Sequence, residues 1–130
     1  MSAELNVVDS SGWIEYFTGS SNADVFAAPI EATEQLIVAS ISVLEVFRWV
    51  CREHGETDAL RAVALMQQGH VVDLDTTLAL RAANLGIEHK LPLADSVLFA
   101  TAHVFGATLW TQDSEFEGIA GVEYHPTRQR

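Results

Sequence analysis

The stretch Leu36-Ile37-Val38-Ala39 decides the fold. It is an unbroken apolar run, whereas a strand with one wet face alternates apolar and polar residues. Unbroken runs of this length are typical of strands buried on both faces of a parallel sheet. We therefore expect Leu36–Ala39 to be a strand in a sheet that helices cover on both sides.

Other segments of the chain alternate between strand and helix patterns around this run. Further strands are expected at Leu5–Asp9, His70–Leu74, Thr108–Thr111 and Val122–Tyr124. Helices are expected from near Ser11 to the break at Gly19-Ser20-Ser21, over roughly 23–28 with a stop at Pro29, from a cap at Ser40 or Ser42 to His54, from Glu56 to Gly69, after a cap at Asp75, and from Leu93 or Ala94 to just before Gly106. Strands separated by helices need crossover connections, so the predicted class is α/β, with a five-stranded parallel sheet sandwiched between helices.

The chain's length and composition predict one domain over residues 1–130. At 130 residues and 48% apolar composition it can bury a sizeable core, and it has no linker or repeat. We expect no membrane span, because no apolar run approaches about 20 residues, and no secretory leader, because the N-terminus lacks a basic region. Cys51 is the only cysteine, which suits a reducing cytoplasm. Only His125–Arg130 is expected to be loosely held.

The net charge of −11 limits the kind of partner. Seven basic residues stand against eighteen acidic ones, and Lys90 is the only lysine. This argues against a protein that holds nucleic acid on a broad basic surface. It is compatible with an enzyme that reaches phosphates through metal, and it favours a basic partner.

Four acidic residues lie where strands end or helices begin; we call Asp9, Glu45, Asp95 and Asp113 the acidic quartet. In a parallel sheet these positions fall at one edge, beyond the carboxyl ends of the strands. Clustered carboxylates repel one another unless cations hold them. Oxygen ligands suit Mg²⁺ or Mn²⁺, and two such ions would clamp a phosphoryl displacement. The pattern therefore predicts a metal-dependent reaction on phosphates.

Each acid also has a structural interpretation. Asp9 suits a turn or cap, Asp95 a helix-dipole partner, Asp113 a cap with Ser114, and Glu45 the wet face of a helix. The convergence of all four on one edge favours the site.

Neighbouring polar side chains add weaker candidates. The hydroxyls of Ser10 and Thr111 are positioned to orient a carboxylate or a metal-bound water, or to bond to nearby backbone. Arg48 and Arg52 lie one and two turns beyond Glu45, where an ion pair or solvation is favoured over contact with a substrate phosphate. The histidines lack zinc-site spacing, and no phosphate-binding glycine loop or G-x-S-x-G elbow is present.

Four segments together resemble PIN-domain ribonucleases, and among them the VapC-type toxins of toxin–antitoxin pairs. They are Val7-Val8-Asp9-Ser10-Ser11-Gly12-Trp13-Ile14-Glu15-Tyr16-Phe17, Ser40-Ile41-Ser42-Val43-Leu44-Glu45-Val46, Leu91-Pro92-Leu93-Ala94-Asp95-Ser96-Val97-Leu98-Phe99-Ala100-Thr101-Ala102 and Leu109-Trp110-Thr111-Gln112-Asp113-Ser114-Glu115-Phe116. Their order and spacing cover nearly the whole chain. The Thr-x-Asp-x-x-Phe and Leu-Pro-x-Ala-Asp elements within them are weak alone, but strong when found with the other two segments.

The resemblance implies a PIN-like nuclease domain in which Asp9, Glu45, Asp95 and Asp113 surround Mg²⁺ or Mn²⁺. It implies endonucleolytic cleavage of RNA by a cytoplasmic homodimer, silenced in a hetero-oligomer with a VapB-type antitoxin whose basic side chain enters the acidic pocket. The chain departs from this pattern in its scarcity of basic residues, which puts the grip on RNA in question.

Two alternatives remain. One is a catalytically silent PIN-like binding partner. The other is a receiver-like signalling domain in which Asp9 or a neighbour accepts a phosphoryl group. Such a domain needs a lysine at a strand end, whereas Lys90, the only lysine, falls between two expected helices.

Overall fold

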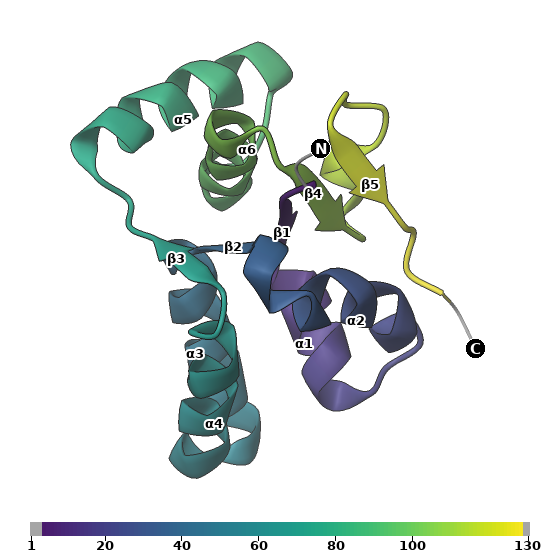
Figure 1. Cartoon of the computed structure of the whole chain (residues 1–130). Coiled ribbons are helices and arrows are strands. Elements are labelled where there is room, and N and C mark those ends of the chain that lie inside the picture. The colour runs from purple at the N-terminus through teal and green to yellow at the C-terminus, as the bar shows by residue number, and fades with distance from the viewer. Residues whose placement is uncertain (1–3, 129–130) are drawn as a thin grey trace.

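The computed structural model describes residues 4–128 as a three-layer α/β domain (Figure 1). Its strands are β1 (Asn6–Val8), β2 (Leu36–Ala39), β3 (His70–Val72), β4 (Thr108–Thr111) and β5 (Val122–Tyr124). Its helices are α1 (Ser10–Thr18), α2 (Ala23–Glu31), α3 (Ser40–His54), α4 (Glu56–Met66), α5 (Thr76–His89) and α6 (Leu93–Phe105), with short 3-10 turns at Thr33–Gln35 and Ser114–Phe116. Within the described residues, none of the helices is long and apolar enough to cross a bilayer.

The strands form one sheet in the order β3-β2-β1-β4-β5, and every neighbouring pair is parallel. This confirms the predicted five-stranded parallel sheet. The chain steps outward from β1 through β2 to β3, then crosses back to place β4 on the other side of β1. The order reverses between β1 and β4, which is where open α/β sheets form their ligand crevices.

Alternate residues of the central strands point to opposite faces of the sheet and pack into two separate hydrophobic cores. Val8 and Val38 pack with Trp13 and Phe26 under α1–α4, on one face of the sheet. Val7 and Leu109 pack under α6 on the other face. Figure 1 shows this division, with α5 and α6 on one side of the strands and α1–α4 on the other. Because both faces are covered, β2 is wholly buried, as its unbroken apolar run predicts.

Two predicted boundaries were wrong because contacts with other parts of the fold set them. The strand expected to reach Leu74 ends at Val72, because its neighbour β2 ends at Ala39, the register partner of Val72. The helix expected to end at Pro29 continues to Glu31 with Pro29 inside it, because Pro29 is buried between Phe26 and Ile30. Tertiary packing there outweighs the hydrogen bond that proline cannot donate.

Neither serine expected to cap α3 does so. Its cap position is Ala39, without a side-chain bond. The Ser40 hydroxyl instead accepts from the Leu74 amide at 3.3 Å, and the Ser42 hydroxyl accepts from Ser10 at 3.2 Å. Asp75 does cap α5, by accepting from the Leu78 amide at 2.8 Å.

The C-terminal segment is anchored as far as it is described. The His125 amide donates to the Thr111 carbonyl at 2.8 Å, and the Pro126 carbonyl accepts from Asn22 at 3.1 Å. Arg128 donates to the Ser21 carbonyl at 3.2 Å. The prediction of a loose tail was wrong for residues 125–128, and residues 129–130 lie outside the described part.

Candidate metal centre

Asp9 is held at the end of β1 by the start of α1. Residue 9 is the N-cap of that helix, and its Oδ1 accepts from the Gly12 amide at 3.0 Å and the Ser11 hydroxyl at 2.7 Å. The cap needs Gly12 to approach closely, since a Cβ there would lie 2.7 Å from Val8 and 2.8 Å from Phe26. A side chain only 3% exposed is thus fixed in direction by local structure.

Thr111 joins Asp9 to Asp113 across the β1–β4 pair. Its buried hydroxyl donates to Asp9 Oδ2 and accepts from the Asp113 amide at 2.9 Å. Asp113 in turn caps the following 3-10 turn by accepting from the Glu115 amide at 3.0 Å. The two aspartates, from opposite ends of the chain, therefore share one positioning hydroxyl.

Glu45 is oriented from the first turn of α1. The Ser10 hydroxyl donates to Glu45 Oε1 at 2.6 Å and also contacts the Ser42 hydroxyl at 3.2 Å. Ser10 and Thr111 thus each donate to a carboxylate of the acidic quartet, which is the orienting contact expected of them. The part of Ser42 was missed, because the sequence assigned it to helix capping.

Asp95 lies in the first turn of α6, partly buried among the other acids. Burial, a hydrogen bond with Asp113, and the negative charges of Asp113, Asp9 and Glu45 raise the pKa of Asp95 to about 7. Burial also raises the pKa of Asp9, although hydrogen bonds from Thr111, Ser11 and Gly12 oppose the increase. The structure therefore brings the whole quartet within electrostatic reach of Asp95.

The donor chemistry of this edge fits a hard dication. All four candidates offer carboxylate oxygens, and within residues 4–128 none of them forms an ion pair with a lysine, arginine or histidine. Their negative charge is therefore uncompensated. In the same residues no three histidine, cysteine, aspartate or glutamate side chains are already arranged as a metal site. Both Asp9 oxygens face protein donors, and Glu45 Oε1 faces Ser10. The metal site remains a prediction.

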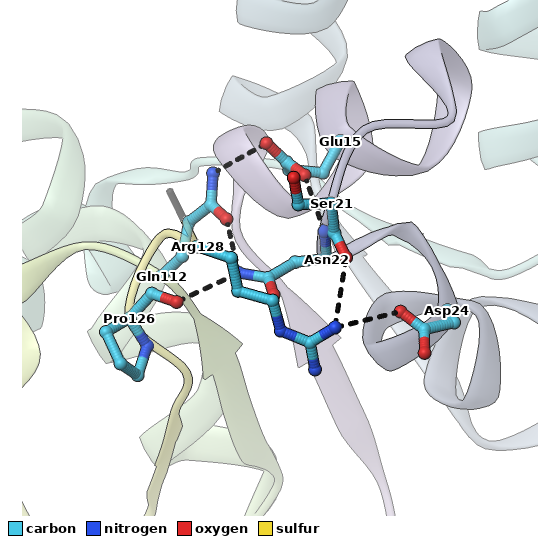
Figure 2. Close-up of polar contacts among 7 residues, drawn as sticks. All are labelled: Glu15, Ser21, Asn22, Asp24, Gln112, Pro126 and Arg128. Carbon is cyan, nitrogen blue, oxygen red and sulfur yellow. Dashed lines mark hydrogen bonds and ion pairs between the residues drawn. The ribbon is translucent and has the colours of Figure 1, made fainter. Parts of the chain in front are cut away.

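A ring of amide and carboxylate groups supports the loop between Thr111 and Asp113 (Figure 2). Asn22 is only 1% exposed, and its side-chain Nδ2 donates to Gln112 Oε1 at 3.0 Å. Its backbone amide donates to Glu15 Oε2 at 3.0 Å. Gln112 Nε2 completes the ring on Glu15 at 3.4 Å. Sequence reasoning missed this support. The only sign of it in the sequence was that Gln112 lies between Thr111 and Asp113.

The receiver-like alternative finds no support at this edge. Lys90 is the C-cap of α5, in a left-handed conformation with φ 56°, and lies between α5 and α6 and not after a strand.

The sequence model of the PIN domain matches residues 7–122. The chain belongs to the PIN domain family. The resemblance inferred from the sequence is thereby confirmed. Among curated proteins, none matches this PIN domain.

Solved structures similar to this PIN domain include proteins of toxin–antitoxin systems. A toxin–antitoxin complex from Klebsiella pneumoniae contains a chain with 27% identity and a TM-score of 0.77, covering 91% of this chain and 95% of that one. VapC20 from Mycobacterium tuberculosis, a toxin that cleaves the sarcin–ricin loop, has 16% identity and a TM-score of 0.73, with 88% and 95% covered. DNA-bound VapBC from Salmonella typhimurium has 16% identity and a TM-score of 0.72, with 97% and 100% covered. At 16% identity the likeness shows the fold alone.

Proposed function

We propose that this PIN domain is a metal-dependent endoribonuclease toxin of the VapC type, which hydrolyses RNA phosphodiester bonds in the cytoplasm. The observation that carries the proposal is the convergence of Asp9, Glu45, Asp95 and Asp113 at the carboxyl edge of the sheet, where burial and then the neighbouring carboxylates raise the pKa of Asp95 to about 7. Similarity to a chain of a solved toxin–antitoxin complex supports the choice of a toxin role, and the shared fold of VapC20, which cleaves the sarcin–ricin loop, supports the choice of RNA.

The residues of the quartet would hold Mg²⁺ or Mn²⁺ through their carboxylates. The bound ion would activate water and stabilise the leaving oxygen of the phosphodiester. The Thr111 hydroxyl keeps Asp9 turned toward Asp113, and the Ser10 hydroxyl fixes one oxygen of Glu45. Asp95 would be one of these ligands, and a bound cation would favour its ionised form.

The same proposal includes a VapB-type antitoxin and a homodimer. An uncompensated cluster of carboxylates in a chain of net charge −11 is a suitable receptor for a basic side chain of such an antitoxin. Leu80, Ile87 and Leu93 on α5 and α6 are 65%, 78% and 86% exposed, which favours burial of this face against a second copy.

The test is cleavage of total cellular RNA with Mg²⁺ or Mn²⁺, with and without a chelator. Asp113→Asn keeps the size of the side chain and removes one negative charge, so we expect it to abolish cleavage. Asp73→Asn is the matched control, because Asp73 is exposed after β3 and outside the quartet. Cleavage that persists in the chelator, or in Asp113→Asn, would discard the proposal.

A further inference from the structure

A hollow of about 490 Å³ extends from the candidate centre along α1 and α3. Ser10 and Ser11 line it from the first turn of α1, and Glu45 lines it from α3. The same hollow continues past Arg48 and Arg52. Figure 1 shows α1 and α3 on the same face of the sheet. Of the acidic quartet, Glu45 therefore borders a groove that also contains two arginines.

The charge of this groove is opposite in sign to that of the molecule. Glu45 is its only acidic residue, and the Ser10 hydroxyl already donates to it. Arg48 and Arg52 are two of only seven basic residues in a chain of net charge −11. Cations are thus concentrated beside the one edge where a phosphodiester would react.

Neither guanidinium is committed to a strong internal contact. Within residues 4–128 Arg48 has no hydrogen bond or ion pair. Arg52 Nε lies 3.8 Å from Glu53 Oε1, and these two side chains are 61% and 50% exposed. Exposed pairs of this kind contribute little, so both arginines are available to an external anion.

The spacing of the two arginines follows the direction of the groove. Positions 45, 48 and 52 share one helical face, and the helical rise places Arg48 about 4.5 Å and Arg52 about 10.5 Å from Glu45 along the axis. Guanidinium groups bind phosphate oxygens in a planar, two-pronged geometry. A polyanion leaving the quartet along α3 would meet the two cations in succession.

We propose that this groove holds the single-stranded RNA backbone on one side of the cut, with Arg48 and Arg52 contacting successive phosphates. The inference rests on the proposed nuclease function and names the residues that grip its substrate. It accounts for RNA binding in a strongly acidic protein, because a short basic track replaces a broad basic surface. It also revises the expectation that these arginines serve only internal pairs or solvation.

The test compares Arg48→Ala/Arg52→Ala with wild type in binding a fluorescently labelled, mixed-sequence, single-stranded RNA, in chelator and over a range of salt. Each single-strand phosphate contact contributes about 0.7 to the slope of log affinity against log salt, so we expect the double variant to lose about 1.4. The lysine pair Arg48→Lys/Arg52→Lys should recover most of that slope. With Mg²⁺, the alanine pair should raise KM for RNA far more than it lowers kcat.

Arg81→Ala is the matched control. Arg81 is exposed, has no ion pair among the described residues, and lines a different hollow with Asp73 and Asp75. Arg81→Ala removes one positive charge outside the groove, whereas the alanine pair removes two inside it, so the control should leave the salt slope and KM unchanged. Unaltered melting temperatures would show that all variants are folded.

Equal RNA affinity and salt slope in wild type and the alanine pair would overturn the proposal that this groove binds RNA. A wild type that binds no RNA would overturn it as well. Loss of a protein partner's binding with RNA affinity intact would also overturn it, because the groove would then hold a polypeptide. Cleavage of bis(p-nitrophenyl) phosphate by wild type with Mn²⁺ tests the proposed function separately. RNA binding through the two arginines without cleavage of any diester would support the RNA-binding groove and contradict the proposed nuclease function.

Discussion

Asp9 and Asp95 belong to the same acidic quartet, but the fold holds them in different ways. Asp9 is surrounded by donors, with the Gly12 amide and the Ser11 and Thr111 hydroxyls on its two oxygens. Within the described residues Asp95 has no such donors: burial, and after it the neighbouring carboxylates of the other three acids, raise its pKa to about 7. Asp9 is therefore part of the framework, whereas Asp95 responds to whatever charge enters the centre.

This difference shows how an acidic centre can be both folded and ready for a cation. The donors around Asp9 bring β1, α1 and β4 together without any ion. The repulsion around Asp95 remains unrelieved, and a positive charge would remove it. Substitutions at the two positions should therefore move stability in opposite directions.

The largest expected effect is on activity at Asp95. Asp95→Asn should lower RNA cleavage by about 100- to 1000-fold, the range seen when one electrostatic element of a reaction is lost. It should also raise the melting temperature of the metal-free protein, because it removes a charge from a repulsive group. Cleavage assays and thermal melts in chelator measure both. A lower melting temperature for Asp95→Asn than for wild type would contradict the expectation that substitutions at Asp95 and Asp9 change stability in opposite directions.

Asp9→Ala should destabilise the protein instead. It removes the α1 cap and leaves the buried Thr111 hydroxyl without its acceptor, which together should lower the free energy of unfolding by about 2 kcal/mol. Urea denaturation in chelator measures the change. Asp24→Ala, in the first turn of α2 and exposed, is the control and should cost much less.

A smaller effect is expected where the two aspartates are joined. Thr111→Val removes the hydroxyl shared by Asp9 and Asp113 and should cost about 1 kcal/mol of unfolding free energy, with a fall of about 10-fold in affinity for Mg²⁺. Thr101→Val is the matched control, since Thr101 is equally buried but bonds only to the Val97 carbonyl in its own helix. Equal Mg²⁺ affinities in the two variants would show that Thr111 does not position the aspartates.

The last expected effect is a pH dependence of stability that comes from Asp95. Its pKa rises from 3.8 to about 7 on folding, so between these values the folded state binds more protons than the unfolded state. The contribution of Asp95 to folding stability is therefore fully present below pH 3.8 and is lost as the pH rises through about 7. Metal-free wild type should therefore lose stability across this window, and Asp95→Asn should lose less. Saturating Mg²⁺ should flatten the wild-type profile, as urea titrations at successive pH values would reveal.

The sequence predicts those parts of this molecule that depend on local pattern. The unbroken run Leu36–Ala39 predicts a doubly covered strand, and β2 has those bounds. Gly106, in a left-handed conformation at φ 62°, ends α6 where expected. The family segments place each acid of the quartet after a strand or at a helix start, and the fold brings those positions to one edge.

Features that depend on distant partners could not be predicted in the same way. Asn22 bonds to residues 90 and 104 positions away, so nothing near it in the chain marks it as a support for the Gln112 loop. Ser42 looks like a helix cap until Ser10 is seen beside it. The prediction of a loose tail likewise overlooked the Thr111 carbonyl as an acceptor for His125.

The position of β1 has a consequence for the protein's synthesis. The middle strand of the sheet is synthesised before the other four, and the Asp9 side chain bonds to a residue 102 positions later. Such a long-range contact forms late, after its partner strand exists. A nascent chain that has not yet exposed β4 cannot assemble the acidic edge, so the proposed activity cannot begin before β4 has been synthesised.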